Sequence, residues 1–298
     1  MSSPVSRREF LATATATAAL AAGLPAAGAD KGGTYAIIGF SKPFQSMSPD
    51  ETAQFVAEVG WDGIECPVRP KGHVEPERAD QDLPRMVEAL GKRKLVLGIA
   101  TTGILRADAA AEKLLRTIAK AGIKRYRMGV WKYKLDQPIW PQVKEIGQAL
   151  RGLAELNKEL DLQGGFQNHS GRDFVGAPVW DLHAMIQDMD RLHMGVHFDI
   201  GHATVEGGYA WDIHSRLMGP HMAAVYVKDF VWKKLDKGWK AQWGPLGEGM
   251  VSREFFKALK KSDFAGPISA HQEYPMGDRA AMLAAMRKDL KVLKGWLA

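Results

Sequence analysis

Residues 194–202 read Met-Gly-Val-His-Phe-Asp-Ile-Gly-His, and this stretch shows the pattern that decides the fold. Its apolar residues predict a short buried strand, which ends near Asp199, with His202 three residues further on. Residues 211–217 then have the apolar spacing of an amphipathic helix. A buried strand, a polar strand end and a helix thus form one unit, and the same unit is found elsewhere in the chain.

The unit occurs eight times between residue 35 and the end of the chain. The predicted strands cover residues 35–40, 63–68, 95–101, 125–131, 162–168, 194–200, 223–228 and 267–273. The predicted helices cover residues 50–59, 83–90, 109–121, 140–160, 180–189, 211–217, 253–261 and 279–296. Parallel strands need crossover connections, and eight such units close into a barrel more naturally than they extend an open sheet. We therefore predict an α/β fold, a single (β/α)8 TIM barrel.

An open, doubly wound sheet is the alternative fold. The chain has neither a Gly-x-Gly-x-x-Gly sequence after its first predicted strand nor a P-loop sequence, which removes the commonest nucleotide-binding versions of that sheet. The 298 residues include one cysteine, Cys66, so the monomer cannot contain a disulfide. The net charge of +6 does not by itself imply nucleic-acid binding.

Residues 1–29 resemble a bacterial twin-arginine export signal. Arg7 and Arg8 precede an apolar stretch, and residues 27–29, Ala-Gly-Ala, have the small-residue pattern of a cleavage site. The apolar stretch, residues 10–24, is shorter than the roughly 20 residues that a membrane span needs. We therefore expect residues 30–298 to form an exported, periplasmic barrel domain with no membrane span after the signal is cleaved.

Polar side chains stand at the carboxyl ends of several predicted strands, the edge at which barrel enzymes place their chemistry. These residues are Glu65, Gln167, Asn168, His169, Asp199, His202, Lys228, His271 and Glu273. A carboxylate buried without a partner costs several kcal/mol, so Asp199 and Glu273 need a metal, a cationic partner or water. Lys228 is a candidate cationic partner. An ion pair between Glu65 and Lys228 across the barrel mouth is the alternative structural role for these two residues.

The order of these residues resembles the xylose isomerase-like TIM barrels of the sugar phosphate isomerase and epimerase group, which includes the D-tagatose 3-epimerase and inosose dehydratase families. The resemblance rests on motifs that match successive strands from about residue 35 onward. They are Asp62-Gly63-Ile64-Glu65, Asn168-His169, Asp199 with His202, Val227-Lys228-Asp229 and the Glu of strand eight. The resemblance implies one divalent metal ion (Mn, Mg, Co or Zn) held at the strand ends.

Taken position by position, the resemblance implies that Asp199 is a metal ligand and that His202 binds substrate. Gln167 and Tyr226 stand where the family has a ligand Glu and a ligand His. A neutral Gln offers a carbonyl oxygen but no charge, so the site departs from the family pattern. The candidate metal ligands are Asp199, Gln167, His271 and Glu273.

Isomerisation or epimerisation of a sugar, and elimination next to a carbonyl, all begin with removal of a proton beside a polarised C=O. A divalent metal stabilises the resulting enediolate, and a carboxylate or imidazole moves the proton. The candidate catalytic residues are Glu65, His169, Lys228 and Glu273, and the candidate substrate-binding residues are His202, Asn168 and Trp232. Residues 231–250 are predicted to be irregular, and within them residues 232–243 interleave tryptophans, including Trp232, with lysines. This pattern suits a carbohydrate platform, single-stranded nucleic acid or plain packing on the rim.

The sequence therefore predicts an exported, metal-dependent carbohydrate isomerase or epimerase, or a lyase on a keto-sugar. Its partner is a small carbohydrate and not nucleic acid, because export separates it from DNA; the sequence does not indicate an oligomeric state. A non-catalytic carbohydrate-binding barrel that has lost its metal is one alternative. An endonuclease IV-like nuclease is another, disfavoured because few of the nine histidines fall at the required strand ends.

Overall fold

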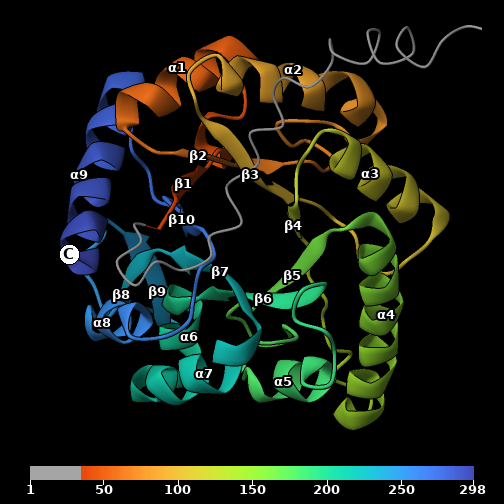
Figure 1. The fold of residues 1–298 in the computed structure, drawn as a ribbon. Coiled ribbons are helices and arrows are strands. Elements are labelled where there is room, and N and C mark those ends of the chain that lie inside the picture. Colours follow the sequence, from red (N-terminus) through yellow and green to blue (C-terminus); the bar gives the residue numbers. More distant parts are fainter. Residues whose placement is uncertain (1–34) are drawn as a thin grey trace, which may run out of the picture.

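Eight parallel strands close into a barrel in the computed structural model, which describes residues 35–298 (Figure 1). Around the barrel the strand order is β1-β10-β7-β6-β5-β4-β3-β2, and each strand pairs in parallel with its neighbours. The strands are β1 (Ile37–Phe40), β2 (Gly63–Pro67), β3 (Val96–Thr101), β4 (Arg125–Arg127), β5 (Gln163–Gln167), β6 (Met194–Asp199), β7 (Met222–Val227) and β10 (Ile268–Ala270). The predicted TIM barrel is confirmed, and the doubly wound alternative is wrong. The export segment, residues 1–29, lies outside the described residues.

The helices lie outside the barrel and cover its strands (Figure 1). They are α1 (Pro49–Val59), α2 (Ala79–Gly91), α3 (Ala109–Lys120), α4 (Ile139–Leu160), α5 (Trp180–Ile186), α6 (Ile200–Gly207), α7 (Trp211–Met218), α8 (Glu254–Lys260) and α9 (Arg279–Leu297). Short 3-10 helices span Lys42–Phe44, Pro76–Arg78, Gly208–Ala210 and Gly219–His221. Every predicted helix is present, and α6 is an additional one. No helix of the described part is long and apolar enough to cross a membrane.

Two kinds of core hold the barrel. The large one lies between the strands and the surrounding helices, and it includes Cys66, whose thiol is buried and has its pKa raised to about 12 by that burial. The small one fills the barrel interior with Ile38, Ile99, Ala224 and Tyr226. Because side chains alternate between the two faces of each strand, the same interior also receives the polar residues near the strand ends.

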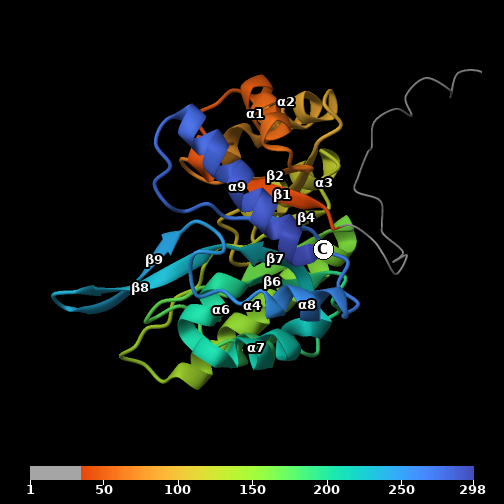
Figure 2. The same cartoon turned by 90° about the vertical axis from the view of Figure 1, so that its left-hand side faces the viewer.

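A β-hairpin follows β7 and projects beyond the barrel (Figure 2). Its strands, β8 (Asp229–Leu235) and β9 (Gly238–Gly244), pair antiparallel. They are joined by a two-residue turn, and Gly238 follows it with φ of 110°, a conformation that favours glycine. The sequence predicts irregular structure for residues 231–250, and this prediction is wrong for the hairpin. Antiparallel pairing, rather than an apolar periodicity, orders this segment.

Candidate functional site

Glu65 is fully buried inside the barrel and is surrounded by hydrogen-bond donors. Its Oε1 accepts a hydrogen bond from the Thr101 hydroxyl, and its Oε2 accepts from Ser269 Oγ at 2.7 Å and from His271 Nε2 at 2.8 Å. Arg127 Nη1 lies 3.6 Å from Oε1. Burial opposes ionisation, but charge interactions with His271 and Arg127 and the hydrogen bonds outweigh it, so the pKa of Glu65 lies well below its usual value. Glu65 is therefore an ionised anchor for the residues around it.

A chain of polar contacts crosses the barrel mouth from β4 to the end of β10. Arg127 Nη1 donates to Gln167 Oε1 at 2.6 Å, and Gln167 Nε2 donates to Asp199 Oδ2 at 2.8 Å. Lys228 Nζ lies 3.2 Å from Asp199 Oδ2 and donates to Glu273 Oε2 at 2.8 Å. The expected partnership of Lys228 with both carboxylates is present, whereas Glu65 contacts Arg127 and His271 instead of Lys228. The proposed Glu65–Lys228 ion pair is wrong.

Among the carboxylates at the barrel mouth, Glu273 is the one that reaches the solvent. Its side chain is 24% exposed, against 2% for Lys228 and 0% for Asp199. Burial raises the pKa of Glu273, but the ammonium of Lys228 overcomes this, with help from His271 and from Lys42 Nζ at 3.2 Å, and holds the pKa well below its usual range. Glu273 therefore stays ionised at the mouth, where it can accept hydrogen bonds from a ligand.

Two histidines lie side by side next to these polar contacts. The ring centroids of His169 and His202 are 4.0 Å apart with the rings tilted by 33°, and His169 stacks on Phe174 at 4.6 Å. His202 Nδ1 lies 2.6 Å from Ser170 Oγ, whereas its buried Nε2 has no hydrogen-bond partner among the described residues. Burial and, secondarily, the charge of Lys228 lower the pKa of both imidazoles. Both rings are therefore neutral at physiological pH and can accept a proton.

The fold places His202 through the end of β6. Asp199 Oδ1 accepts a hydrogen bond from the His202 backbone N–H at 3.0 Å and so caps α6. Asn168 holds the same strand end, because its Nδ2 donates to the Asp199 carbonyl at 3.0 Å and its Oδ1 accepts from the Asp199 N–H at 2.7 Å. Asn168 was predicted to bind substrate, but both ends of its amide are already used to position Asp199.

The four predicted metal ligands do not share one point, because two of them, Asp199 and Glu273, converge on Lys228 and the other two face elsewhere. His271 Nε2 faces Glu65, the Gln167 oxygen faces Arg127, and the Lys228 ammonium lies between Asp199 and Glu273. Tyr226, which the resemblance places where a ligand His would stand, is buried with its hydroxyl 2.7 Å from His197 Nδ1. Within residues 35–298 no group of three or more His, Cys, Asp or Glu side chains is arranged to hold a metal ion. The residues present therefore do not fit a divalent metal.

The hairpin forms one wall of the site. Lys228 Nζ lies 4.6 Å from the centroid of the Trp243 ring, and this ring meets His202 edge to face at 5.0 Å. Phe230 is paired with Trp243, Trp232 with Ala241 and Lys234 with Trp239. Because directly paired residues share a face and alternate residues return to it, these six residues line one face of the hairpin. The aromatic face therefore starts at the site and continues outward through Trp232, which is 43% exposed.

Sequence reasoning missed Arg127 and Trp243. A signal for Arg127 was present, since Arg125-Tyr126-Arg127 places charges in a short strand whose burial needs a partner. Nothing in the pattern distinguished Trp243 from Trp239, because only the pairing register shows which one is next to the barrel.

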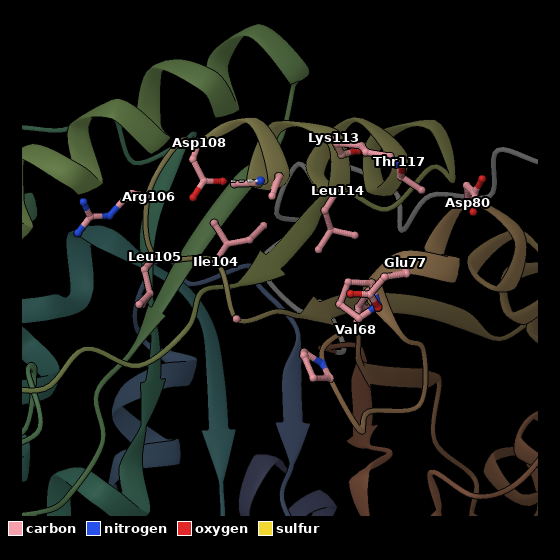
Figure 3. A pocket seen from close by; sticks show the side chains of 15 residues that line it. Val68, Glu77, Asp80, Ile104, Leu105, Arg106, Asp108, Lys113, Leu114 and Thr117 are labelled. Atoms are coloured by element: carbon pink, nitrogen blue, oxygen red, sulfur yellow. Dashed lines mark hydrogen bonds between the residues drawn. The ribbon is translucent and has the colours of Figure 1, made fainter.

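A separate hollow of about 530 Å³ lies between the segments that follow β2 and β3 and helix α3 (Figure 3). Its lining includes Val68, Asp80, Ile104, Arg106 and Leu114, and it is mainly apolar. Its lining contains neither the residues linked by polar contacts at the barrel mouth nor His169 and His202. The hollow is therefore distinct from the charged barrel mouth.

Comparisons with known proteins agree with this architecture. The sequence profile of the family described as "Xylose isomerase-like TIM barrel" matches residues 53–296. The fold is similar to that of 3-keto-D-glucoside 4-epimerase from E. coli, with 16% identity, a TM-score of 0.68, and coverage of 88% of this chain and 100% of that one. It is also similar to a D-psicose 3-epimerase crystallised in the presence of D-fructose, with 16% identity, a TM-score of 0.68, and coverage of 89% and 99%.

A third similar structure is a xylose isomerase-like TIM barrel protein from Mycobacterium smegmatis in complex with magnesium, with 15% identity, a TM-score of 0.63, and coverage of 89% and 98%. Likeness at these identities establishes the fold alone. Comparison with curated protein sequences gave no significant match.

Proposed function

The chain belongs to the xylose isomerase-like TIM barrel family, and from this premise we propose that it is a carbohydrate isomerase or epimerase. The observation that carries the proposal is the pair of neutral histidines, His169 and His202, beside the buried ammonium of Lys228. Proteins of the same fold include epimerases named for a 3-keto-glucoside and for D-psicose. A lyase that acts on a keto-sugar begins with the same proton removal and belongs to the same proposal.

In the proposed reaction His202 removes the proton next to the substrate carbonyl. The ring is neutral, and its Nε2 has no hydrogen-bond partner among the described residues and lies 3.7 Å from Asp199 Oδ2. In the proposal this nitrogen accepts the proton when a bound sugar reaches it. His169, whose ring centroid lies 4.0 Å from that of His202, supplies a second imidazole for return of the proton. The negative charge that develops on the carbonyl oxygen is stabilised by Lys228, whose charge acts strongly because its surroundings exclude water.

The carboxylates have supporting roles in this proposal. Glu65 is ionised and saturated with donors, so it positions Arg127 and His271 and does not exchange protons with substrate. Glu273 is paired with Lys228 and partly exposed, which suits it to accept hydrogen bonds from sugar hydroxyls. The divalent metal expected from the sequence has no part in these steps, because the residues at the mouth do not fit one.

The aromatic face of the hairpin is the proposed sugar platform. Trp243 lies against Lys228 and His202, and Trp232 follows on the same face. Aromatic rings stack on the C–H faces of sugars with little loss of side-chain entropy, because two torsions fix each ring. We propose that Trp232 contacts the part of the carbohydrate farther from the reacting carbonyl.

We separately propose that residues 1–29 direct export by the twin-arginine pathway. Its support is the Arg7-Arg8 pair, the short apolar stretch and the small-residue pattern before Asp30. Export places the enzyme among unphosphorylated sugars. Cell fractionation of the full chain and of the R7K/R8K variant tests it: the full chain should reach the periplasm in a shortened form and the variant should not. Equal periplasmic amounts of both would contradict export.

The function is tested by incubating the purified protein with free ketoses and 3-keto-glycosides and following new epimers or elimination products by NMR. Product formation is expected with the wild type and not with H202Q. One observation favours a non-catalytic carbohydrate-binding barrel: the side chains at the mouth already satisfy one another, with Gln167 and Tyr226 at positions where ligands were expected. Sugar binding without any product would support that second candidate.

A further inference from the structure

We propose that the ammonium of Lys228 permanently occupies the position that a divalent cation would take between Asp199 and Glu273, so that the site works without a metal. Lys228 Nζ lies 3.2 Å from Asp199 Oδ2 and 2.8 Å from Glu273 Oε2. Its side chain is 2% exposed, so water does not screen these contacts. The two carboxylates arrive from the strands on either side of β7, the strand that Lys228 follows. A pair of converging carboxylates is the usual start of a cation site, and here a covalently attached cation fills it.

The neighbouring groups present donors where a metal needs lone pairs. Arginine can only donate, so the 2.6 Å contact from Arg127 fixes the Gln167 oxygen toward Arg127 and leaves its NH2 group on Asp199. Asp199 Oδ2 thus receives the Gln167 amide and the Lys228 ammonium together. Burial, the first cause, raises the pKa of Tyr226 well above its usual value, so its hydroxyl remains a neutral phenol. His202 Nε2 lies 3.7 Å from Asp199 Oδ2, but within the described part of the chain no group of three or more His, Cys, Asp or Glu side chains is arranged to hold a metal ion.

The carboxylates of the site already have cationic or donor partners. Asp199 and Glu273 share Lys228, and Glu65 lies beside Arg127 and His271. A divalent ion added beside Lys228 would place a second cation in the same buried space, which is strongly unfavourable. Displacement of the ammonium would likewise leave it buried without a partner. The arrangement therefore selects against a divalent ion as well as replacing it.

The inference rests on the proposed function for its role in the reaction, because it names the group that stabilises the developing oxyanion. Its test measures metal binding, so it does not depend on knowing the sugar. A failure to find turnover would count against the proposed function alone, whereas stoichiometric metal in the wild type would count against the Lys228 assignment alone.

The experiment titrates Mn²⁺, and separately Zn²⁺, into the full-length protein after treatment with EDTA, with calorimetry and elemental analysis as readouts. The wild type is expected to bind no stoichiometric metal and to show the same Tm with and without EDTA. K228M removes the ammonium and leaves both carboxylates, and K228M/Q167E adds a third. These variants should gain one Mn²⁺ site, at least tenfold tighter in the double variant, with a Tm that Mn²⁺ raises.

The matched control is K132M, which removes a surface lysine paired with Asp173 and should gain no site. One equivalent of tightly bound metal in the wild type would overturn the assignment, as would a folded K228M/Q167E protein with no gain in Mn²⁺ affinity. If the variants do not fold, the wild-type titration alone still decides the matter.

Discussion

Replacing Glu65 with Gln removes the buried negative charge that holds Arg127 and His271 in place. The carboxylate accepts hydrogen bonds from Thr101, Ser269 and His271. It also lies 3.6 Å from the guanidinium of Arg127, a residue that is only 7% exposed. The Gln amide keeps one acceptor but turns an NH2 group toward groups that also donate. Removing one partner of a buried ion pair costs about 3–5 kcal/mol. Because Gln keeps one acceptor, we expect a loss near the lower end, about 3 kcal/mol.

The assay is thermal unfolding followed by circular dichroism, with urea unfolding as a second measure. For a chain of this size each kcal/mol corresponds to about 2–4 °C in Tm, so E65Q should unfold about 6–12 °C below the wild type at pH 7. The control is E254Q, which affects an exposed pair with Lys257 and should leave the Tm close to that of the wild type. A loss below about 1 kcal/mol in E65Q would refute the buried-anchor reasoning.

The stability that Glu65 contributes depends on pH. The folded pKa of Glu65 is lowered, so its stabilising contribution is fully present above the unfolded pKa of about 4.3 and is lost as pH falls toward the folded value. The Tm difference between the wild type and E65Q should therefore be constant from pH 6 to 8 and narrow below about pH 4. A difference that widens in acid would contradict an ionised Glu65.

Three further predictions concern catalysis. H202Q should lower kcat at least about 100-fold with little change in KM, whereas H221Q, at a histidine that contacts the Met189 carbonyl, should be near wild type in steady-state kinetics. Because burial lowers the pKa values of His169 and His202 below the usual 6.5, the acidic fall of the rate should be centred below pH 6.5; a fall centred at pH 6.5 or above would contradict neutral imidazoles. W232A should raise KM about 5–10-fold, which corresponds to a loss of about 1 kcal/mol in binding, and leave kcat unchanged. The control is V231A, which alters an equally exposed residue (43%) on the other face of the hairpin and should leave KM unchanged.

The strands and helices could be predicted because their signals are local. An apolar run such as residues 194–199 and the periodicity of α3 or α9 depend on each segment's own residues and on burial of one face. Helix α6 was missed because it is short and its beginning depends on the Asp199 cap. The hairpin was missed because its order comes from pairing between β8 and β9, which no single strand reveals.

The residues of the site could be identified in part, but their partners could not. Strand ends gather at one edge of a barrel, so Asp199, Lys228 and Glu273 were expected to meet, and they do. Which donor each carboxylate contacts depends on how the closed barrel brings distant strands together: Glu65 contacts Arg127 and His271. His271 Nε2 therefore faces Glu65 and not the other predicted ligands.

The most direct test of a proton-transfer site built from neutral histidines and a lysine is deuterium wash-in. EDTA-treated protein is incubated in D2O with free ketoses and 3-keto-glycosides, and deuterium at the carbon next to the carbonyl is measured by NMR and mass spectrometry. We predict incorporation by the metal-free wild type and at least about 100-fold slower incorporation by H202Q. A sugar that binds and shows no exchange, or exchange that appears only after Mn²⁺ is added, would contradict a metal-free proton-transfer site.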